Sequence, residues 1–96
     1  MSEREAYKKK FEAEIELAHA KLAQLKAQAK NASADARIRY EQIVDNLEQL
    51  LDATKTKLRE LGSSSEEAWE ALKVGVEAAW GDFTTGLDNA TAKLKR

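Results

Sequence analysis

The chain has 96 residues, of which 43% are hydrophobic and 34% are charged, and its formal net charge at pH 7 is −1. This length has room for one domain, residues 1–96, and the composition excludes both a disordered tail and a membrane protein. The near-neutral charge argues against bulk attraction to nucleic acid, and a chain without cysteine has no disulfide framework and no thiol nucleophile.

The chain contains no proline and is rich in Ala, Glu, Lys and Leu, so nothing removes an amide donor from a helix interior. We therefore expect an all-α protein. The N-terminal sequence MSEREAYKKKFEAE lacks the apolar core of a signal peptide, and no apolar run approaches the roughly 20 residues of a membrane span. These features predict a cytoplasmic protein without stable membrane association.

The first predicted helix covers about residues 2–31. Ser2 with Glu5 fits a capping box at its start, and Lys26 and Lys30 suit a helix C-terminus. Its apolar residues recur at steps of three and four, which places them on one helical face. They are Tyr7, Phe11, Ile15, Ala18, Leu22, Leu25 and Ala29.

The next segment, NASADA (residues 31–36), predicts a turn. Asn31 suits a left-handed C-cap, Ser33 an N-cap, and Asp35 the first turn of a new helix. The segment has neither Gly nor Pro, and the apolar stripe passes through it without losing phase. A continuous helix over residues 2–61 is therefore the alternative.

The second predicted helix covers residues 34–61, with Gly62 at the position after its end. The sequence SSSEE follows, and Ser64 with Glu67, or Ser63 with Glu66, would form a capping box that opens a third helix. The apolar stripe of the second helix comprises Ala36, Tyr40, Ile43, Leu47, Leu50, Thr54, Leu58 and Leu61.

The third predicted helix covers residues 65–94 and carries both tryptophans. Its pattern repeats at a shift of eleven residues, which keeps one stripe on one face. Gly75 and Gly86 flank the stripe and would let a neighbouring helix approach closely, whereas Gly81 with Asp82 could mark a kink. The stripe comprises Trp69, Leu72, Val76, Ala79, Trp80, Phe83, Leu87, Ala90 and Leu94.

Three segments of similar length predict an up-down-up three-helix coiled-coil bundle. Tyr7 and Phe11 would then share an end with Trp69, and Trp80 would be largely buried against the small Ala18. The alternative, a continuous helix with the third helix folded back, would need a second copy in a domain-swapped antiparallel dimer. In either case we expect one set of residues to form the core or an interface: Tyr7, Phe11, Leu22, Tyr40, Leu47, Trp69, Leu72, Val76, Trp80, Phe83 and Leu87.

The sequence predicts no catalytic, cofactor-binding or metal-binding residue. Glu16 and His19 have the spacing of half a di-iron motif, but Glu16 points away from the apolar stripe, so a metal site is a remote alternative. The basic run Lys8–Lys10 is surrounded by glutamates and predicts a solvated helix face. The third helix is amphipathic, and a lipid-surface protein is a second alternative, although acidic residues on its polar face oppose this.

The segments ASADARIRYEQ (residues 32–42), LEQLLDATKTKLRELGSSSEEAWEALKVGVEAAW (47–80) and above all AWEALKVGVEAAWGDF (68–83) give the chain its resemblance to known proteins. It resembles a group of small bacterial coiled-coil proteins described as stress-response or uncharacterised coiled-coil-domain proteins. The resemblance implies a non-enzymatic cytoplasmic protein linked to stress, without a cofactor. Residues 81–86, GDFTTG, depart from the group's pattern and leave the continuity of the third helix open.

Together these features predict a non-catalytic coiled-coil protein that acts through protein–protein contact or self-association. They identify no partner, and they leave a homodimer open.

Overall fold

The computed structural model describes residues 3–94, which form three α-helices and no strand. Helix α1 is Glu3–Lys30, α2 is Ala34–Gly62 and α3 is Glu66–Leu94, each bound lying within one residue of its predicted position. The prediction of an all-α three-helix bundle is confirmed. The predicted capping box of Ser2 with Glu5 lies outside the described residues, as does the side chain of Leu94.

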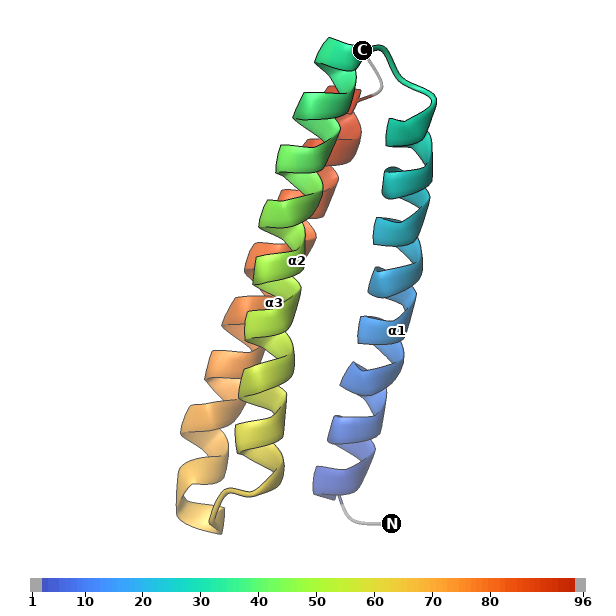
Figure 1. Cartoon of the computed structure of the whole chain (residues 1–96). Helices are drawn as coiled ribbons and strands as arrows, with labels where there is room; N and C mark the ends of the chain where they lie inside the picture. The colour runs from blue at the N-terminus through green and yellow to red at the C-terminus, as the bar shows by residue number, and fades with distance from the viewer. Residues whose placement is uncertain (1–2, 95–96) are drawn as a thin grey trace.

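The three helices lie side by side in a rod of 51 × 21 × 18 Å (Figure 1). Helices α1 and α3 run in the same direction and α2 runs opposite to them. We call the end where α1 begins and α2 joins α3 the lower end, and the end with the α1–α2 turn the upper end.

Helix α2 packs against both other helices, whereas no Cα atom of α1 comes within 8 Å of one of α3 in the described residues. Because α2 has two neighbours, it buries a wider face than a single stripe. Val44 and Leu51, which the predicted stripe omitted, are 2% and 1% exposed. Thr54 is also buried, and its hydroxyl donates to the carbonyl oxygen of Leu50 at 3.1 Å.

The turn between α1 and α2 has the predicted N-cap but not the predicted C-cap. The Ser33 hydroxyl accepts a hydrogen bond from the amide of Ala36 at 3.4 Å. Asn31 does not adopt a left-handed conformation, because no described residue other than glycine has a positive φ, and no described glycine has one. Arg37 binds the last carbonyls of α1 and satisfies them in place of a left-handed C-cap.

The turn between α2 and α3 corrects two predictions. Gly62 is the last residue of α2 and not the residue after it, and Ser63 is the C-cap. Neither predicted capping box forms, because Ser65 caps α3 by accepting from the amide of Ala68 at 3.3 Å. The hydroxyls of Ser63 and Ser64 instead donate to carbonyls of α2, at 3.3 and 2.7 Å.

Helix α3 is continuous through residues 81–86, which answers the question that the sequence left open. At Gly86 a Cβ atom would lie 3.2 Å from Cδ2 of Leu47, which shows that this glycine does let α2 approach closely. At Gly81 a Cβ atom would meet no atom within 4 Å.

Candidate functional site

Aromatic rings fill the space between α1 and α3 from the lower end to just above the middle of the bundle. The ring centroids of Tyr7 and Trp69 lie 5.5 Å apart, and those of Phe11 and Trp80 lie 6.0 Å apart, both in edge-to-face arrangements. Trp80 also stacks on Phe83 at 5.4 Å. Since the backbones of α1 and α3 stay apart, these large side chains provide the contact between the two helices.

Polar contacts of α1 close the lower end. The Arg4 guanidinium donates to the carbonyl oxygens of Leu61 and Ser64, at 3.3 and 2.7 Å, and lies 4.7 Å from the centre of the Trp69 ring. These bonds satisfy carbonyls at the C-terminal end of α2, where a positive charge is also favoured by the helix dipole. The start of α1 is therefore fixed to the turn between α2 and α3.

The Tyr7 hydroxyl donates to the Glu77 carboxylate at 3.2 Å, and the Lys73 ammonium lies 5.3 Å from the centre of the Tyr7 ring. The pKa of Tyr7 is raised to about 12. Burial of the side chain is the largest cause, and the negative charge of Glu77 and the hydrogen bond to it raise the pKa further. This tyrosine is therefore a hydrogen-bond donor at neutral pH and joins α1 to α3.

Above Phe11 in α1 and Phe83 in α3, the described parts of these two helices carry no aromatic residue, and an open groove of about 730 Å³ separates their side chains. Leu25 of α1, Leu87 of α3 and Tyr40 of α2 form its apolar floor, and all three are half-buried. Its other lining residues are polar or small: Lys21, Gln24, Gln28, Asp88, Thr91 and Ala92. We call this depression the α1–α3 groove.

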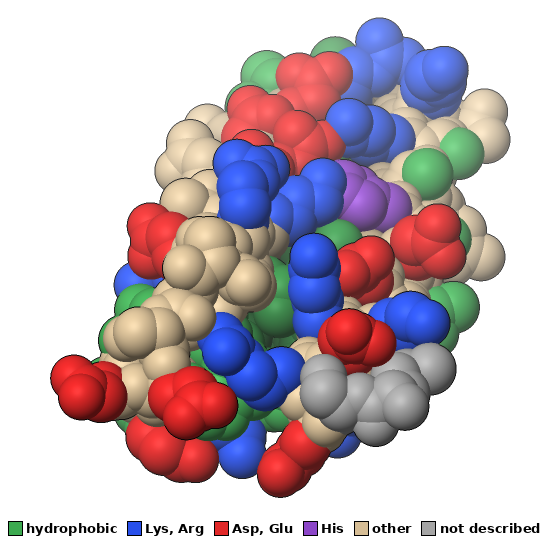
Figure 2. Space-filling view, turned by 90° about the horizontal axis from the view of Figure 1, so that it is seen from below, with side chains coloured by type: hydrophobic (Ala, Val, Ile, Leu, Met, Phe, Trp, Pro, Cys, Tyr) green, Lys and Arg blue, Asp and Glu red, His purple; other side chains and the backbone are tan. Residues whose placement is uncertain are grey.

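A second groove of about 980 Å³ lies between α1 and α2 at the lower end. Lys8, Lys9, Lys55 and Arg59 line it, together with Glu12, Glu16 and His19. Figure 2, which views this end, shows Lys and Arg side chains around a strip of hydrophobic surface, with acidic side chains at its borders. Because α1 contributes Glu12 and Glu16 as well as lysines, and α2 contributes Lys55 and Arg59, the groove carries charges of both signs.

Higher along the same seam Lys26 of α1 forms an ion pair with Glu48 of α2. His19 and Glu16 are both exposed on α1. No group of three or more His, Cys, Asp or Glu residues in residues 3–94 is arranged to hold a metal ion.

The predicted core or interface residues fall into two burial classes. Phe11, Leu22, Leu47, Val76 and Phe83 are buried, whereas Tyr7, Tyr40, Trp69, Leu72, Trp80 and Leu87 are half-buried. Trp80 is half-buried and packs against the core cluster. Its ring contacts are with Phe11 and Phe83.

Sequence reasoning missed the α1–α3 groove, although one signal for it was present. The last aromatic residues of the first and third predicted helices are Phe11 and Phe83, which leaves the α1–α3 gap above them to leucine and alanine. Exposed large apolar side chains elsewhere are isolated: Leu17, Ile38 and Val74 are 68%, 56% and 64% exposed.

Among the described residues, no helix has the length and apolarity that crossing a bilayer requires. No protein-family model matches the sequence, and neither a curated protein nor a solved structure matches it. The resemblance to small bacterial coiled-coil stress-response proteins stays a prediction.

Proposed function

We propose that this chain is a non-catalytic coiled-coil protein that acts through protein–protein contact, and that a helix of a partner protein binds in the α1–α3 groove. The observation that carries the proposal is the half-buried apolar floor of Leu25, Tyr40 and Leu87 beneath a polar rim. A groove between parallel helices suits an amphipathic helix that inserts apolar side chains and sets polar residues against the rim.

The rim supports a specific orientation of such a partner. Lys21 on α1 and Asp88 on α3 offer one positive and one negative charge on opposite sides, and Gln24, Gln28 and Thr91 offer hydrogen bonds. The α1 side of the rim, from Lys21 to Gln28, covers about two helical turns, which suits one or two apolar anchors of a partner helix.

The alternative of a lipid-surface protein finds little support in the side-chain placement. Phe83 is buried, and Trp69, Trp80 and Leu87 pack against the core cluster. Presenting them to lipid would require α3 to leave the bundle and lose these contacts, each worth about 1.5–3 kcal/mol for a fully buried large side chain.

The proposal is tested by affinity capture from cells that make the protein, with two matched variants. Tyr40→Arg places a charge on the groove floor, whereas Ile38→Arg places the same charge on the outer face of α2, where Ile38 is 56% exposed. We expect the wild type and Ile38→Arg to recover the same partner and Tyr40→Arg to lose it, with all three chains equally helical. Loss only in Ile38→Arg would assign the contact to the outer face of α2 and contradict the proposed groove.

A further inference from the structure

The turn between α1 and α2 departs from helical geometry at few residues. The amide of Asn31 donates to Gln28 O at 3.1 Å and that of Ala32 to Ala29 O at 3.2 Å, so the chain still winds in the helical sense up to Ala32. Ser33 is extended, with φ −62° and ψ 164°. Since its φ is already helical, rotation of ψ toward about −42° is the main change that joins α1 to α2.

The apolar face also continues through this turn. Ala29 is buried, Ala32 and Ala36 are half-buried, and Tyr40 follows. Their steps of three and four residues are those of one helical face. A continuous helix through residues 29–40 would therefore present the same apolar stripe that α1 and α2 now present separately.

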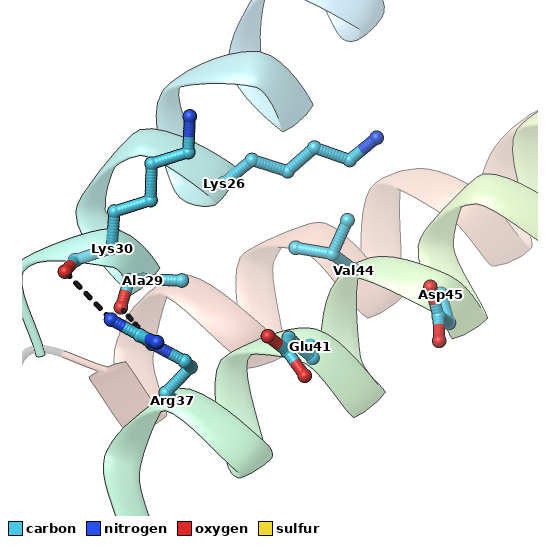
Figure 3. A pocket seen from close by; sticks show the side chains of 7 residues that line it. All are labelled: Lys26, Ala29, Lys30, Arg37, Glu41, Val44 and Asp45. Carbon is cyan, nitrogen blue, oxygen red and sulfur yellow. Dashed lines mark hydrogen bonds between the residues drawn. The ribbon is translucent and has the colours of Figure 1, made fainter. Parts of the chain in front are cut away.

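Arg37 holds the turn in its bent form (Figure 3). Its guanidinium donates to the carbonyl oxygens of Ala29 and Lys30, at 3.4 and 3.0 Å. In a continuous helix the amides of Ser33 and Ala34 would donate to these same two carbonyls. The Arg37 contacts and the helical hydrogen bonds therefore compete.

We propose that the face of α2 and α3 covered by α1 also accepts α1 of a second copy of this chain, in an antiparallel dimer that forms when the turn straightens. Each copy then has one helix over residues 3–62, about 90 Å long, with α3 folded back on it. The dimer is closed and two-fold symmetric, because each α1 fills the place that the other copy has vacated.

The contacts of α1 are of the same kind in both forms, so the turn and the protein concentration decide between them. Side chains alone join α1 to α3, since their Cα atoms stay more than 8 Å apart in the described residues. Straightening loses the Ser33 cap and the Arg37 contacts and gains helical hydrogen bonds across residues 29–36. Arg37 acts as the latch of the single-copy form.

Two variants with opposite effects and one control test this proposal. Ser33→Ala combined with Arg37→Ala removes the cap and the latch. Ala34→Pro fits the first position of α2, since the preceding Ser33 is already extended, but a proline there blocks a continuous helix. Arg39→Ala removes an exposed arginine of the same turn of α2 that makes no hydrogen bond to these carbonyls.

The measurement is the molar mass by light scattering after refolding over a range of protein concentrations, with helicity followed by circular dichroism. Loss of the Ser33 cap alone shifts the turn equilibrium about fivefold, and a dimer contains two turns, which gives about a twenty-five-fold change. Because the opening variant also loses the Arg37 contacts, it should dimerise at a concentration at least about twenty-five-fold lower than the wild type. Ala34→Pro should stay monomeric at every concentration, and Arg39→Ala should match the wild type.

Two results overturn the proposal. One is an opening variant that is monomeric at the highest concentration that stays in solution. The other is a dimer that Ala34→Pro leaves intact, because such a dimer does not need a straight turn. If the double variant loses helicity, Ser33→Ala alone, which keeps Arg37, repeats the test on a folded chain.

Discussion

Replacing Phe83 by alanine probes the packing of α3 directly. Phe83 is 1% exposed, stacks on Trp80 at a centroid distance of 5.4 Å and belongs to the central cluster. Removing a large buried aromatic ring leaves a cavity and costs about 3–5 kcal/mol. A domain of this length has a free energy of unfolding of about 5–15 kcal/mol, so Phe83→Ala should remove a large share of it.

The assay is urea unfolding followed by far-ultraviolet circular dichroism, with linear extrapolation to water. Val74→Ala is the matched control, because Val74 lies on the same helix and is 64% exposed. Its free energy of unfolding should stay within about 0.5 kcal/mol of the wild type. A Phe83→Ala loss below about 1 kcal/mol, when about 3–5 is expected, would refute the burial of this ring in a packed core.

Three further predictions concern single contacts. Gly81→Ala should raise the free energy of unfolding by about 0.5–1 kcal/mol, since its Cβ meets no atom within 4 Å, and Gly86→Ala should stabilise less because its Cβ lies 3.2 Å from a leucine of α2. Arg4→Ala should lower the free energy of unfolding by about 1–2 kcal/mol, because it removes the hydrogen bond to Ser64 O and the contact with the Trp69 ring. Glu77→Gln should lower the pKa of Tyr7 from about 12 only part of the way to 10.0, because burial is the largest cause of the shift.

Urea unfolding checks the glycine and the Arg4 predictions. Equal stabilisation by Gly81→Ala and Gly86→Ala would contradict the first, and an unchanged free energy of unfolding in Arg4→Ala would contradict the second. Spectrophotometric titration checks the third in a Tyr40→Phe background, where Tyr7 is the only tyrosine. Because folding raises the pKa of Tyr7, its contribution to stability is complete below pH 10 and lost as the pH rises toward 12. A pKa of Tyr7 that Glu77→Gln leaves unchanged would refute the contact between Tyr7 and Glu77.

The periodicity of the sequence predicted three helices and their bounds because each helix has an apolar stripe at steps of three and four and the breaks are rich in Asn and Ser, although of the described predicted caps only Ser33 forms. It did not predict Val44 and Leu51 in the core, because a stripe with a single period does not show that α2 faces two neighbours. The sequence also did not show which of the three serines at 63–65 caps α3. Three adjacent hydroxyls can each cap a helix, and the approach of Arg4 to Ser64, far away in sequence, belongs to tertiary structure.

The candidate site was less accessible to sequence reasoning than the helices. The α1–α3 groove depends on the distance between two helices that are not adjacent in the chain, and periodicity carries no information on that distance. Tyr40 was correctly placed on the apolar face of its helix, yet only the bundle shows that its ring is half-buried beside Leu25 and Leu87.

Site-specific photo-crosslinking in cells tests the central claim, that the α1–α3 groove is the partner-binding surface. A photoreactive amino acid at Thr91, on the groove rim, is compared with the same amino acid at Glu70, on the exposed outer face of α3. We expect Thr91 to form a crosslink to a second protein and Glu70 to form none. Crosslinks from Glu70 without any from Thr91 would contradict the claim and place the contact on the outer face of α3.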